Sequence, residues 1–205
     1  MKALVVYCHP SENSFSAAAK DVMSRFFEDN DIEYQISDLY GMNFVSELSA
    51  EEYDRECRMD ETLPVSEDVR LEQEKIQWAD YIFFLFPLFW NDVPAKMKGW
   101  FDRVWTYGFA YGPVLPDGTL TTAAMTQKKA IIYLCSTGNS MEGLNKSDKL
   151  KALRTTLLVD RIYDRARLSE VVVFDQLSHD NPDYERNKIF HLERLKQSLE
   201  TFFEF

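Results

Sequence analysis

Apolar residues in this chain form two kinds of pattern, unbroken runs and runs with helical spacing. Unbroken runs are typical of strands that are covered on both faces, as in a parallel sheet. Four of them occupy residues 3–7, 81–86, 130–135 and 170–174, and a weaker fifth run occupies residues 33–37. The pattern therefore predicts five strands, most of them buried.

Between these runs, apolar side chains recur every three or four positions, which is typical of helices that lay one face on a sheet. Ser14 is a favoured N-cap for the first such helix, and Asp92 and Pro94 read as the cap and the first position of a second. A last helix begins at Asn181 and Pro182 and is predicted to turn these residues inward: Ile189, Leu192, Leu195, Leu199 and Phe202. The alternation of strands and helices predicts an α/β protein with a doubly wound parallel sheet.

The segment 41–79 is longer than a plain connection and is rich in acidic residues. We predict one helix within it, at about residues 66–79, after a long loop. Loops of this length inside a compact domain are usually functional or disordered. The acidic side chains fit a solvated surface, and a lid or a dimer contact is the alternative.

The composition fits one domain that covers residues 1–205. With 45% hydrophobic residues, a chain of 205 residues can bury roughly 70% of the surface that it exposes when unfolded. The longest apolar run, residues 81–90, has about half the length that a membrane-spanning helix needs, and the N-terminus does not read as a signal peptide. We therefore expect a cytoplasmic protein without direct membrane insertion.

Charge and cysteine content narrow the possible partners. The formal net charge of -11 works against binding to nucleic acid or to anionic membranes, which requires basic patches. The three cysteines, Cys8, Cys57 and Cys135, have no metal-ligand spacing, and no metal is expected. Cys8 and Cys135 stand at the ends of apolar strands, so we expect them to be buried, reduced thiols.

Three loops follow three predicted strands and should meet at one edge of the sheet, where open α/β sheets bind ligands. Residues 9–16 offer hydroxyl and amide groups before a helix N-terminus, which suits a phosphate monoester without any Lys or Arg. Residues 87–92 present Phe89 and Trp90 on a turn, and residues 136–145 contain a glycine turn with backbone N–H groups. Phosphate donors, an aromatic wall and a polar turn together predict a site for a flavin mononucleotide moiety. The GxGxxG pattern of dinucleotide sites is absent.

Each part of this site also has a simpler interpretation. His9 fits a loop histidine with satisfied hydrogen bonds, and Phe89 and Trp90 fit core side chains. Trp100, on the inner face of the second helix, is predicted to be core. Because neighbours in a strand point to opposite faces, Cys8 beside His9 argues weakly for a thiol nucleophile. Only the combination of the three loops points to a ligand, and no catalytic residue is assigned.

Four segments of the chain resemble a known family. HPSENSFS, SDLYGMNF, FPLFWNDVPAKMKGWFDRVWTYGFAY and STG are similar to flavodoxin-like NAD(P)H:quinone oxidoreductases, the group of DT-diaphorase and its shorter bacterial relatives. The resemblance covers residues 2–145, and its most specific part is the pattern P-L-x-W-x-x-V-P-A-x-x-K-G-W at residues 87–100. It implies a flavodoxin-like doubly wound five-stranded parallel sheet of order 2-1-3-4-5, with helices on both faces. It also implies bound FMN or FAD, a homodimer with the site at the subunit interface, and two-electron transfer from NAD(P)H to a quinone or similar small acceptor.

Carried over by position, the resemblance implies a role for each loop. The phosphate and ribityl chain of the flavin would be held by His9, Asn13, Ser14, Phe15 and Ser16. The edge of the isoalloxazine ring would be lined by Pro87, Leu88, Phe89, Trp90 and Asn91, and its pyrimidine end by Ser136, Thr137, Gly138 and Asn139. The substrate pocket would be formed by Trp90 and Tyr111, the tyrosine coming from the partner subunit.

One departure from the family leaves the function open. Where the family has a second glycine, then a tyrosine and a histidine credited with balancing charge on the reduced flavin, this chain reads GNSMEGLNKSD. Flavin binding is expected, and the efficiency of hydride transfer is open. Two alternatives therefore remain: a non-catalytic, flavin-binding regulatory subunit of a membrane transport system, and a one-electron carrier of the flavodoxin type. The remaining histidines, His179 and His191, have only surface or packing roles in this interpretation.

Overall fold

The computed structural model describes residues 1–112, 124–141 and 146–204, and within these residues five parallel strands form one sheet in the order β2-β1-β3-β4-β5. The strands are β1 (Lys2–Tyr7), β2 (Glu33–Asp38), β3 (Tyr81–Pro87), β4 (Lys128–Ser136) and β5 (Ala166–Phe174). Each predicted strand and the order 2-1-3-4-5 are confirmed. The strands are longer than their apolar runs because backbone pairing continues into the polar residues at their ends.

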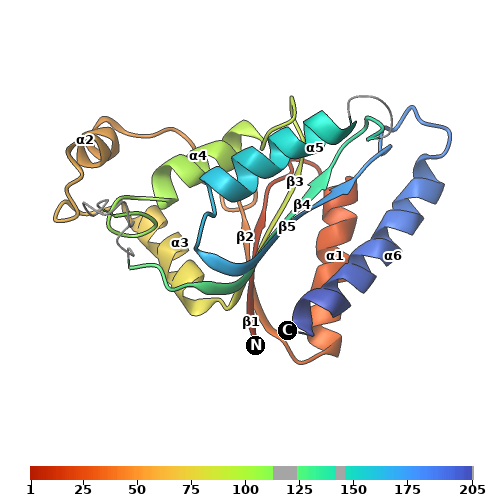
Figure 1. Cartoon of the computed structure of the whole chain (residues 1–205), viewed down its shortest axis with the longest axis horizontal. Coiled ribbons are helices and arrows are strands. Elements are labelled where there is room, and N and C mark those ends of the chain that lie inside the picture. The colour runs from red at the N-terminus through yellow and green to blue at the C-terminus, as the bar shows by residue number, and fades with distance from the viewer. Residues whose placement is uncertain (113–123, 142–145, 205) are drawn as a thin grey trace.

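Helices cover both faces of the sheet, as predicted (Figure 1). On one face lie α1 (Phe15–Asp29) and α6 (Tyr184–Phe203), which pack side by side. On the other face lie α3 (Glu67–Trp78), α4 (Ala95–Val104) and α5 (Lys146–Arg154), and a short π-helix, η1 (Thr155–Asp160), follows α5. The centre of the sheet is therefore buried from both sides, which is why β1, β3 and β4 are mostly apolar.

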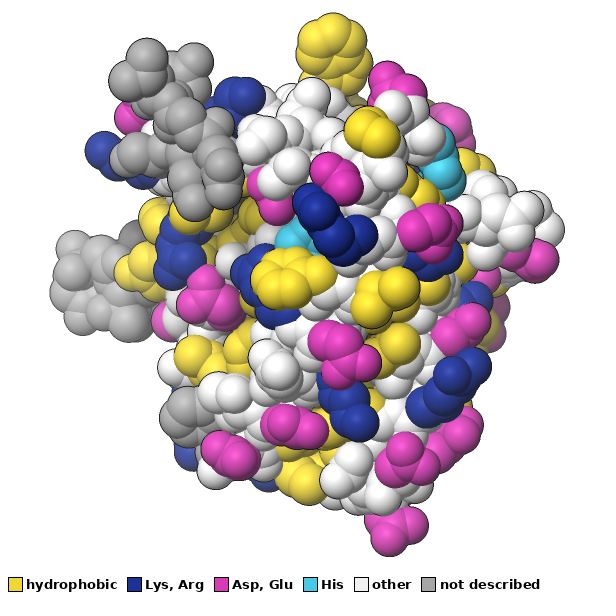
Figure 2. Space-filling model, turned by 90° about the vertical axis from the view of Figure 1, so that its right-hand side faces the viewer, with side chains coloured by type: hydrophobic (Ala, Val, Ile, Leu, Met, Phe, Trp, Pro, Cys, Tyr) yellow, Lys and Arg dark blue, Asp and Glu magenta, His cyan; other side chains and the backbone are white. Residues whose placement is uncertain are grey.

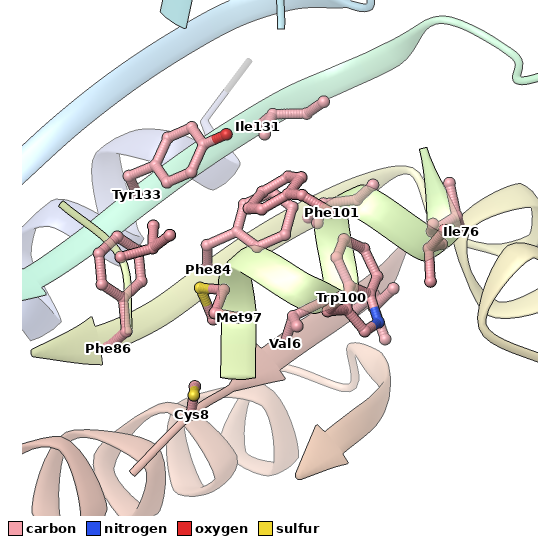
Figure 3. Close-up of a cluster of buried hydrophobic side chains, with 14 of the residues drawn as sticks. Val6, Cys8, Ile76, Phe84, Phe86, Met97, Trp100, Phe101, Ile131 and Tyr133 are labelled. Carbon is pink, nitrogen blue, oxygen red and sulfur yellow. The ribbon is translucent and has the colours of Figure 1, made fainter. Parts of the chain in front are cut away.

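Successive strand residues alternate between two hydrophobic cores. In β1, Val5 belongs to the core under α1 and α6, whereas Val6 belongs to the core under α3 and α4. Figure 3 shows the second core, where Phe84 of β3 and Tyr133 of β4 stack with ring centroids 4.9 Å apart. Trp100 of α4 is fully buried there, as predicted, so its aromatic ring serves packing rather than a ligand.

The N-termini of α1 and α4 differ from each other. Ser14 caps α1, as predicted, with its side chain accepting the backbone N–H of Ala17. The predicted cap of α4 is wrong, because Pro94 itself is the N-cap and the helix begins at Ala95. The carboxylate of Asp92 instead accepts the backbone N–H of Val93 at 2.7 Å. Its other contacts belong to a turn that is described below.

The 41–79 segment contains the predicted α3 and also a helix that the hydrophobic pattern missed, α2 (Ala50–Arg58). A capping box starts α2, in which Ser49 and Glu52 each bond the other's backbone N–H. Arg103 of α4, itself buried, binds the carboxylates of Glu52 and Asp68. Part of the acidic character of this segment therefore anchors it to α4, and is not simply a solvated surface.

The last helix begins later than predicted, at Tyr184, and one of its predicted core positions is wrong. Ile189 is exposed, as is its neighbour Phe190, while His191 takes the buried position next to them. Figure 2 looks onto the face that α6 covers and shows acidic and basic side chains mixed, with hydrophobic side chains between them. The remaining predicted positions, Leu192, Leu195, Leu199 and Phe202, do turn toward the sheet.

Two further expectations concern cysteines and membrane spans. Cys8 and Cys135 are buried and free, as expected, and Cys57 on α2 is free and exposed. None of the helices in the described part of the chain combines the length and the apolar character needed to cross a membrane.

Candidate functional site

The loops after β1, β3 and β4 meet at the carboxyl edge of the sheet, and Ser136 connects them. The backbone N–H of Leu88 donates to the carbonyl of Ser136 at 2.7 Å. The hydroxyl of Ser136 lies 3.3 Å from the hydroxyl of Ser16, in a buried contact between the third loop and the first. The structure therefore brings the three predicted loops together, although residues 142–145 of the third lie outside the described residues.

The start of α1 offers unused hydrogen-bond donors in the first loop. Ser14 satisfies the N–H groups of Ala17 and Ala18, the first with its hydroxyl and the second with its carbonyl. The N–H groups of Phe15 and Ser16 have no acceptor among the described residues, and the first turn of α1 carries no acidic side chain. Free N–H groups at the positive end of a helix bind anions such as phosphate.

His9 and Asn13 complete the first loop. Nδ1 of His9 lies 3.0 Å from the backbone nitrogen and 3.1 Å from the carbonyl oxygen of Ser11, so this ring nitrogen is engaged within the loop. Burial lowers the pKa of His9, which favours the neutral form of the ring. Asn13 is exposed, and its backbone N–H donates to the hydroxyl of Ser11. The loop is thus ordered by its own hydrogen bonds, while Nε2 of His9 and the amide side chain of Asn13 have no partner among the described residues and remain for a ligand.

The second loop is a tight turn that exposes two aromatic rings. Phe89 and Asp92 pair across the turn through both backbone hydrogen bonds, at 3.0 and 3.1 Å. The two residues between them, Trp90 and Asn91, have φ of 54° and 60°, in the left-handed region. Trp90 is fully exposed and Phe89 about half exposed, so the interpretation of these rings as core is wrong. Pro87 and Leu88, by contrast, lie below the turn, buried and half-buried respectively.

The third loop is held by the segment 174–178, for which the sequence predicted no role. Thr137 donates its N–H to the carbonyl of Phe174 and accepts the N–H of Leu177, at 2.8 and 3.0 Å. The carbonyl of Asn139 accepts the N–H of Gln176 at 3.2 Å. A side-chain carbon at Gly138 would lie 3.1 Å from Cβ of Ser178, so this close approach favours glycine.

Asp175 and His191 extend this support to α6. The carboxylate of Asp175 accepts the N–H of Met141 at 2.8 Å, and its carbonyl lies 3.0 Å from Nε2 of His191. Only 4% of His191 is exposed, and burial lowers its pKa. A buried histidine on α6 thus contacts the residue that holds the end of the glycine turn. In the sequence, the only sign of this role was that a polar residue, His191, stands where the helix buries a side chain.

Tyr111 lies with α2 rather than with the three loops. Its hydroxyl donates to Oε2 of Glu56 at 2.6 Å, and the N–H of Tyr107 donates to the same oxygen at 2.9 Å. Burial is the main cause that raises the pKa of Tyr111. The side chain borders a cavity of about 550 Å³ that is lined by residues of α4 and the end of η1, among them Trp105 and Arg161.

The fold and the loop sequences identify the family. Residues 1–174 match the model of the family described as having a flavodoxin-like fold, and the chain belongs to this family. Within it, the chain belongs with the NAD(P)H:quinone oxidoreductases, as its loop motifs implied.

The relatives support this assignment over different shares of their lengths. The NAD(P)H:quinone oxidoreductase from Methanothermobacter marburgensis has a solved structure with a TM-score of 0.83 and 32% sequence identity, covering 97% of this chain and 94% of that one. Ribosyldihydronicotinamide dehydrogenase [quinone] from Pongo abelii is 31% identical over 160 residues, which are 71% of this chain and 67% of the relative. NAD(P)H dehydrogenase [quinone] 1 from Rattus norvegicus is 34% identical over 152 residues, 68% of this chain. The chain spans about half the length of that relative, 54%.

Proposed function

We propose that this protein is a flavin-dependent NAD(P)H oxidoreductase that transfers two electrons, as hydride, from a nicotinamide to a quinone or similar small acceptor. The observation that carries the proposal is the joining of three loops at Ser136, which sets free helix N–H groups, exposed aromatic rings and a glycine turn around one edge of the sheet. The likeness to the quinone oxidoreductase from Methanothermobacter marburgensis over nearly the whole chain supports it.

The residues at this edge fit a flavin, either FMN or FAD. The phosphate and ribityl chain would be held by His9, Asn13, Ser14, Phe15 and Ser16, where free N–H groups and the lack of an acidic side chain favour an anion. The ring would be held by Pro87, Leu88, Phe89, Trp90 and Asn91 along its edge and by Ser136, Thr137, Gly138 and Asn139 at its pyrimidine end. Bound there, a flavin would supply the ability to accept hydride from a nicotinamide and to pass electrons to a quinone.

The contribution of the protein itself would be positioning and charge stabilisation. Exposed apolar rings at Phe89 and Trp90 offer a flat surface for a planar ligand, and a planar ligand would in turn remove them from water. In the third loop, the N–H of Gly138 has no acceptor among the described residues, while Asn139 N–H donates to Thr137 Oγ1 at 3.3 Å. Preorganised donors of this kind stabilise developing negative charge where water is excluded. The N–H of Gly138 and the side-chain amide of Asn139 are the candidates to replace the tyrosine and histidine that this chain lacks.

We further propose a homodimer in which Tyr111 completes the substrate pocket of the partner subunit beside Trp90. Two observations support this arrangement: Trp90 has no cover from the described residues of its own chain, and Tyr111 is bonded to α2 rather than to its own three loops. Exposed Tyr53 and Met59 in the 41–79 segment offer apolar contact area near α2. The buried free thiols of Cys8 and Cys135 are consistent with a cytoplasmic enzyme.

The bound cofactor provides the test. The purified protein should be yellow, and heat release should yield one flavin per chain, whose identity separates FMN from FAD. The double variant Ser14→Glu with Ser16→Glu should lose the flavin, because carboxylates would occupy the phosphate position. Ser49→Glu, which alters the cap of α2 far along the chain from α1, is the matched control and should keep it.

Two outcomes would contradict the proposal. A double variant that folds and keeps its flavin would remove the first loop from the site. Wild-type protein that binds flavin but oxidises neither NADH nor NADPH with a quinone present would favour the regulatory alternative. The relatives named above are quinone dehydrogenases or oxidoreductases by name, which favours the enzyme over both alternatives.

A further inference from the structure

The turn that carries Trp90 is strained and is not held by Trp90 itself. A left-handed backbone conformation is unfavourable for residues other than glycine, although asparagine adopts it more readily than most. Here two consecutive non-glycine residues, Trp90 and Asn91, adopt it. Because the tryptophan side chain is fully exposed, it contributes no packing that would offset the strain. Something outside the two central residues must therefore stabilise this conformation.

Asp92, at the end of the turn, makes the bonds that do so. Its backbone pairs with Phe89 through two hydrogen bonds, which closes the turn. One carboxylate oxygen, Oδ1, accepts the N–H of Val93 at 2.7 Å and both terminal nitrogens of Arg161 at 3.2 Å. Arg161 is distant in the sequence, immediately after η1, so the ion pair ties the turn to the end of η1.

Arg161 is itself held by two aromatic residues of α4 and its end, Phe101 and Trp105. Its side chain is only 9% exposed, against 46% for that of Asp92. The guanidinium lies over the ring of Phe101 of α4, 5.2 Å from the ring centre. The carbonyl of Arg161 accepts the indole N–H of Trp105 at 3.0 Å. The arginine is thus a fixed point, whereas the aspartate lies on the more exposed turn that depends on it.

We propose that Arg161 is a positioning residue for the site: its ion pair with Asp92 holds the strained turn in the conformation that presents Trp90. The part of this inference that concerns turnover rests on the proposed function, and the part that concerns the turn does not. An ordinary half-exposed ion pair contributes little to stability. Loss of a positioning pair would instead change the conformation of Trp90 and weaken the binding of the nicotinamide.

The test uses the variants Asp92→Asn and Arg161→Gln, their double variant, and Arg161→Lys as the conservative replacement. The control is Arg154→Gln, which breaks the ion pair between Arg154 and Glu170, a pair in the same part of the chain that does not touch the turn and whose arginine is more exposed than Arg161. Each protein is labelled with 5-fluorotryptophan and observed without flavin by ¹⁹F NMR. The signal of Trp90 among the four tryptophans is assigned with Trp90→Phe.

We expect the Trp90 signal to shift or broaden in both single variants and to change no further in the double variant. The KM for NADH should rise about tenfold, the loss expected for one charge-assisted hydrogen bond. Arg161→Lys should return both the Trp90 signal and the KM for NADH part of the way to their wild-type values. Lysine keeps the positive charge but cannot contact Asp92 through two nitrogens as arginine does. Arg154→Gln should leave the signal and the KM unchanged.

Unchanged Trp90 signals in Asp92→Asn and Arg161→Gln would overturn the inference, as would the same shift in Arg154→Gln. Failure of the proposed function has a different signature. In that case wild-type protein would show no NADH oxidation, while the flavin-free NMR comparison would still decide whether Arg161 positions the turn.

Discussion

Replacing Trp90 by glycine should leave the flavin-free protein at least as stable as the wild type. For most tryptophans the opposite holds, because they bury a large ring. Trp90 has no buried area to lose, since its side chain is fully exposed. Its backbone φ of 54° is one that glycine adopts without the clash that a side chain causes.

The expected size follows from these two features. Relief of left-handed strain contributes about 1–2 kcal/mol to the stability of the variant. The greater freedom of glycine in the unfolded chain costs about 0.5–1 kcal/mol. The free energy of unfolding should therefore change by about 0 to 1.5 kcal/mol in favour of Trp90→Gly, a Tm increase of at most about 6 °C for a chain of this size.

Trp100→Ala is the comparison, because Trp100 is fully buried against Phe84 and donates its indole N–H to Glu72. Emptying such a position costs about 3–5 kcal/mol, so its Tm should fall by at least about 6 °C. Thermal unfolding of both variants, without flavin and at several protein concentrations, makes the measurement. A fall in Tm of several degrees for Trp90→Gly would refute the reasoning, because it would mean that the ring is packed in solution, for example against a second copy.

Three further predictions follow from burial and charge. In native protein at pH 8, a thiol reagent should label Cys57 alone, since burial raises the pKa of Cys8 to about 12 and that of Cys135 still further; labelling of all three at one rate would contradict this. Burial holds the pKa of His191 below its usual value of about 6.5, so stability should be complete above that pH and fall as the pH drops below it. The loss, measured by urea unfolding at one pH above and one pH below about 6.5, should be smaller in His191→Gln, and an equal loss in both proteins would exclude His191 as its source. If the proposed function holds, Asn139→Asp should slow NADH oxidation several-fold by placing like charge at the ring's pyrimidine end, and equal rates in stopped-flow measurements would remove Asn139 from the mechanism.

The sheet could be predicted from the sequence because its burial is extreme. Every residue of β3 is buried, so Tyr81 to Pro87 show no polar interruption that could be confused with a surface. The meeting of the three loops follows from parallel strand order alone, since parallel strands end at a common edge. The exposure of Trp90 could not be predicted from the sequence, because hydrophobicity alone does not distinguish an exposed aromatic side chain that lines a site from one buried in the core.

The elements that could not be predicted are those whose contacts do not depend on hydrophobic side chains. The only buried residue of α2 is Arg55, so the helix turns no apolar side chains toward the core, and the capping box at Ser49 and Glu52 was its one signal. At α6 the buried position belongs to His191 and the apolar Ile189 faces outward, which inverts the pattern that predicts helix faces.

The 174–178 segment has a consequence for how this site can evolve. The family model matches as far as residue 174, the first residue of that segment, whereas Asp175, Gln176 and Leu177 hold the glycine turn from beyond the match. The contacts of Gln176 and Leu177 are made by backbone groups, which do not depend on the type of side chain. A sequence motif therefore cannot reveal them. An insertion or deletion in this segment would move the turn without altering a single residue of the three loops. Chains with identical loop motifs can therefore diverge in what they accept, and comparison of motifs alone would group them together.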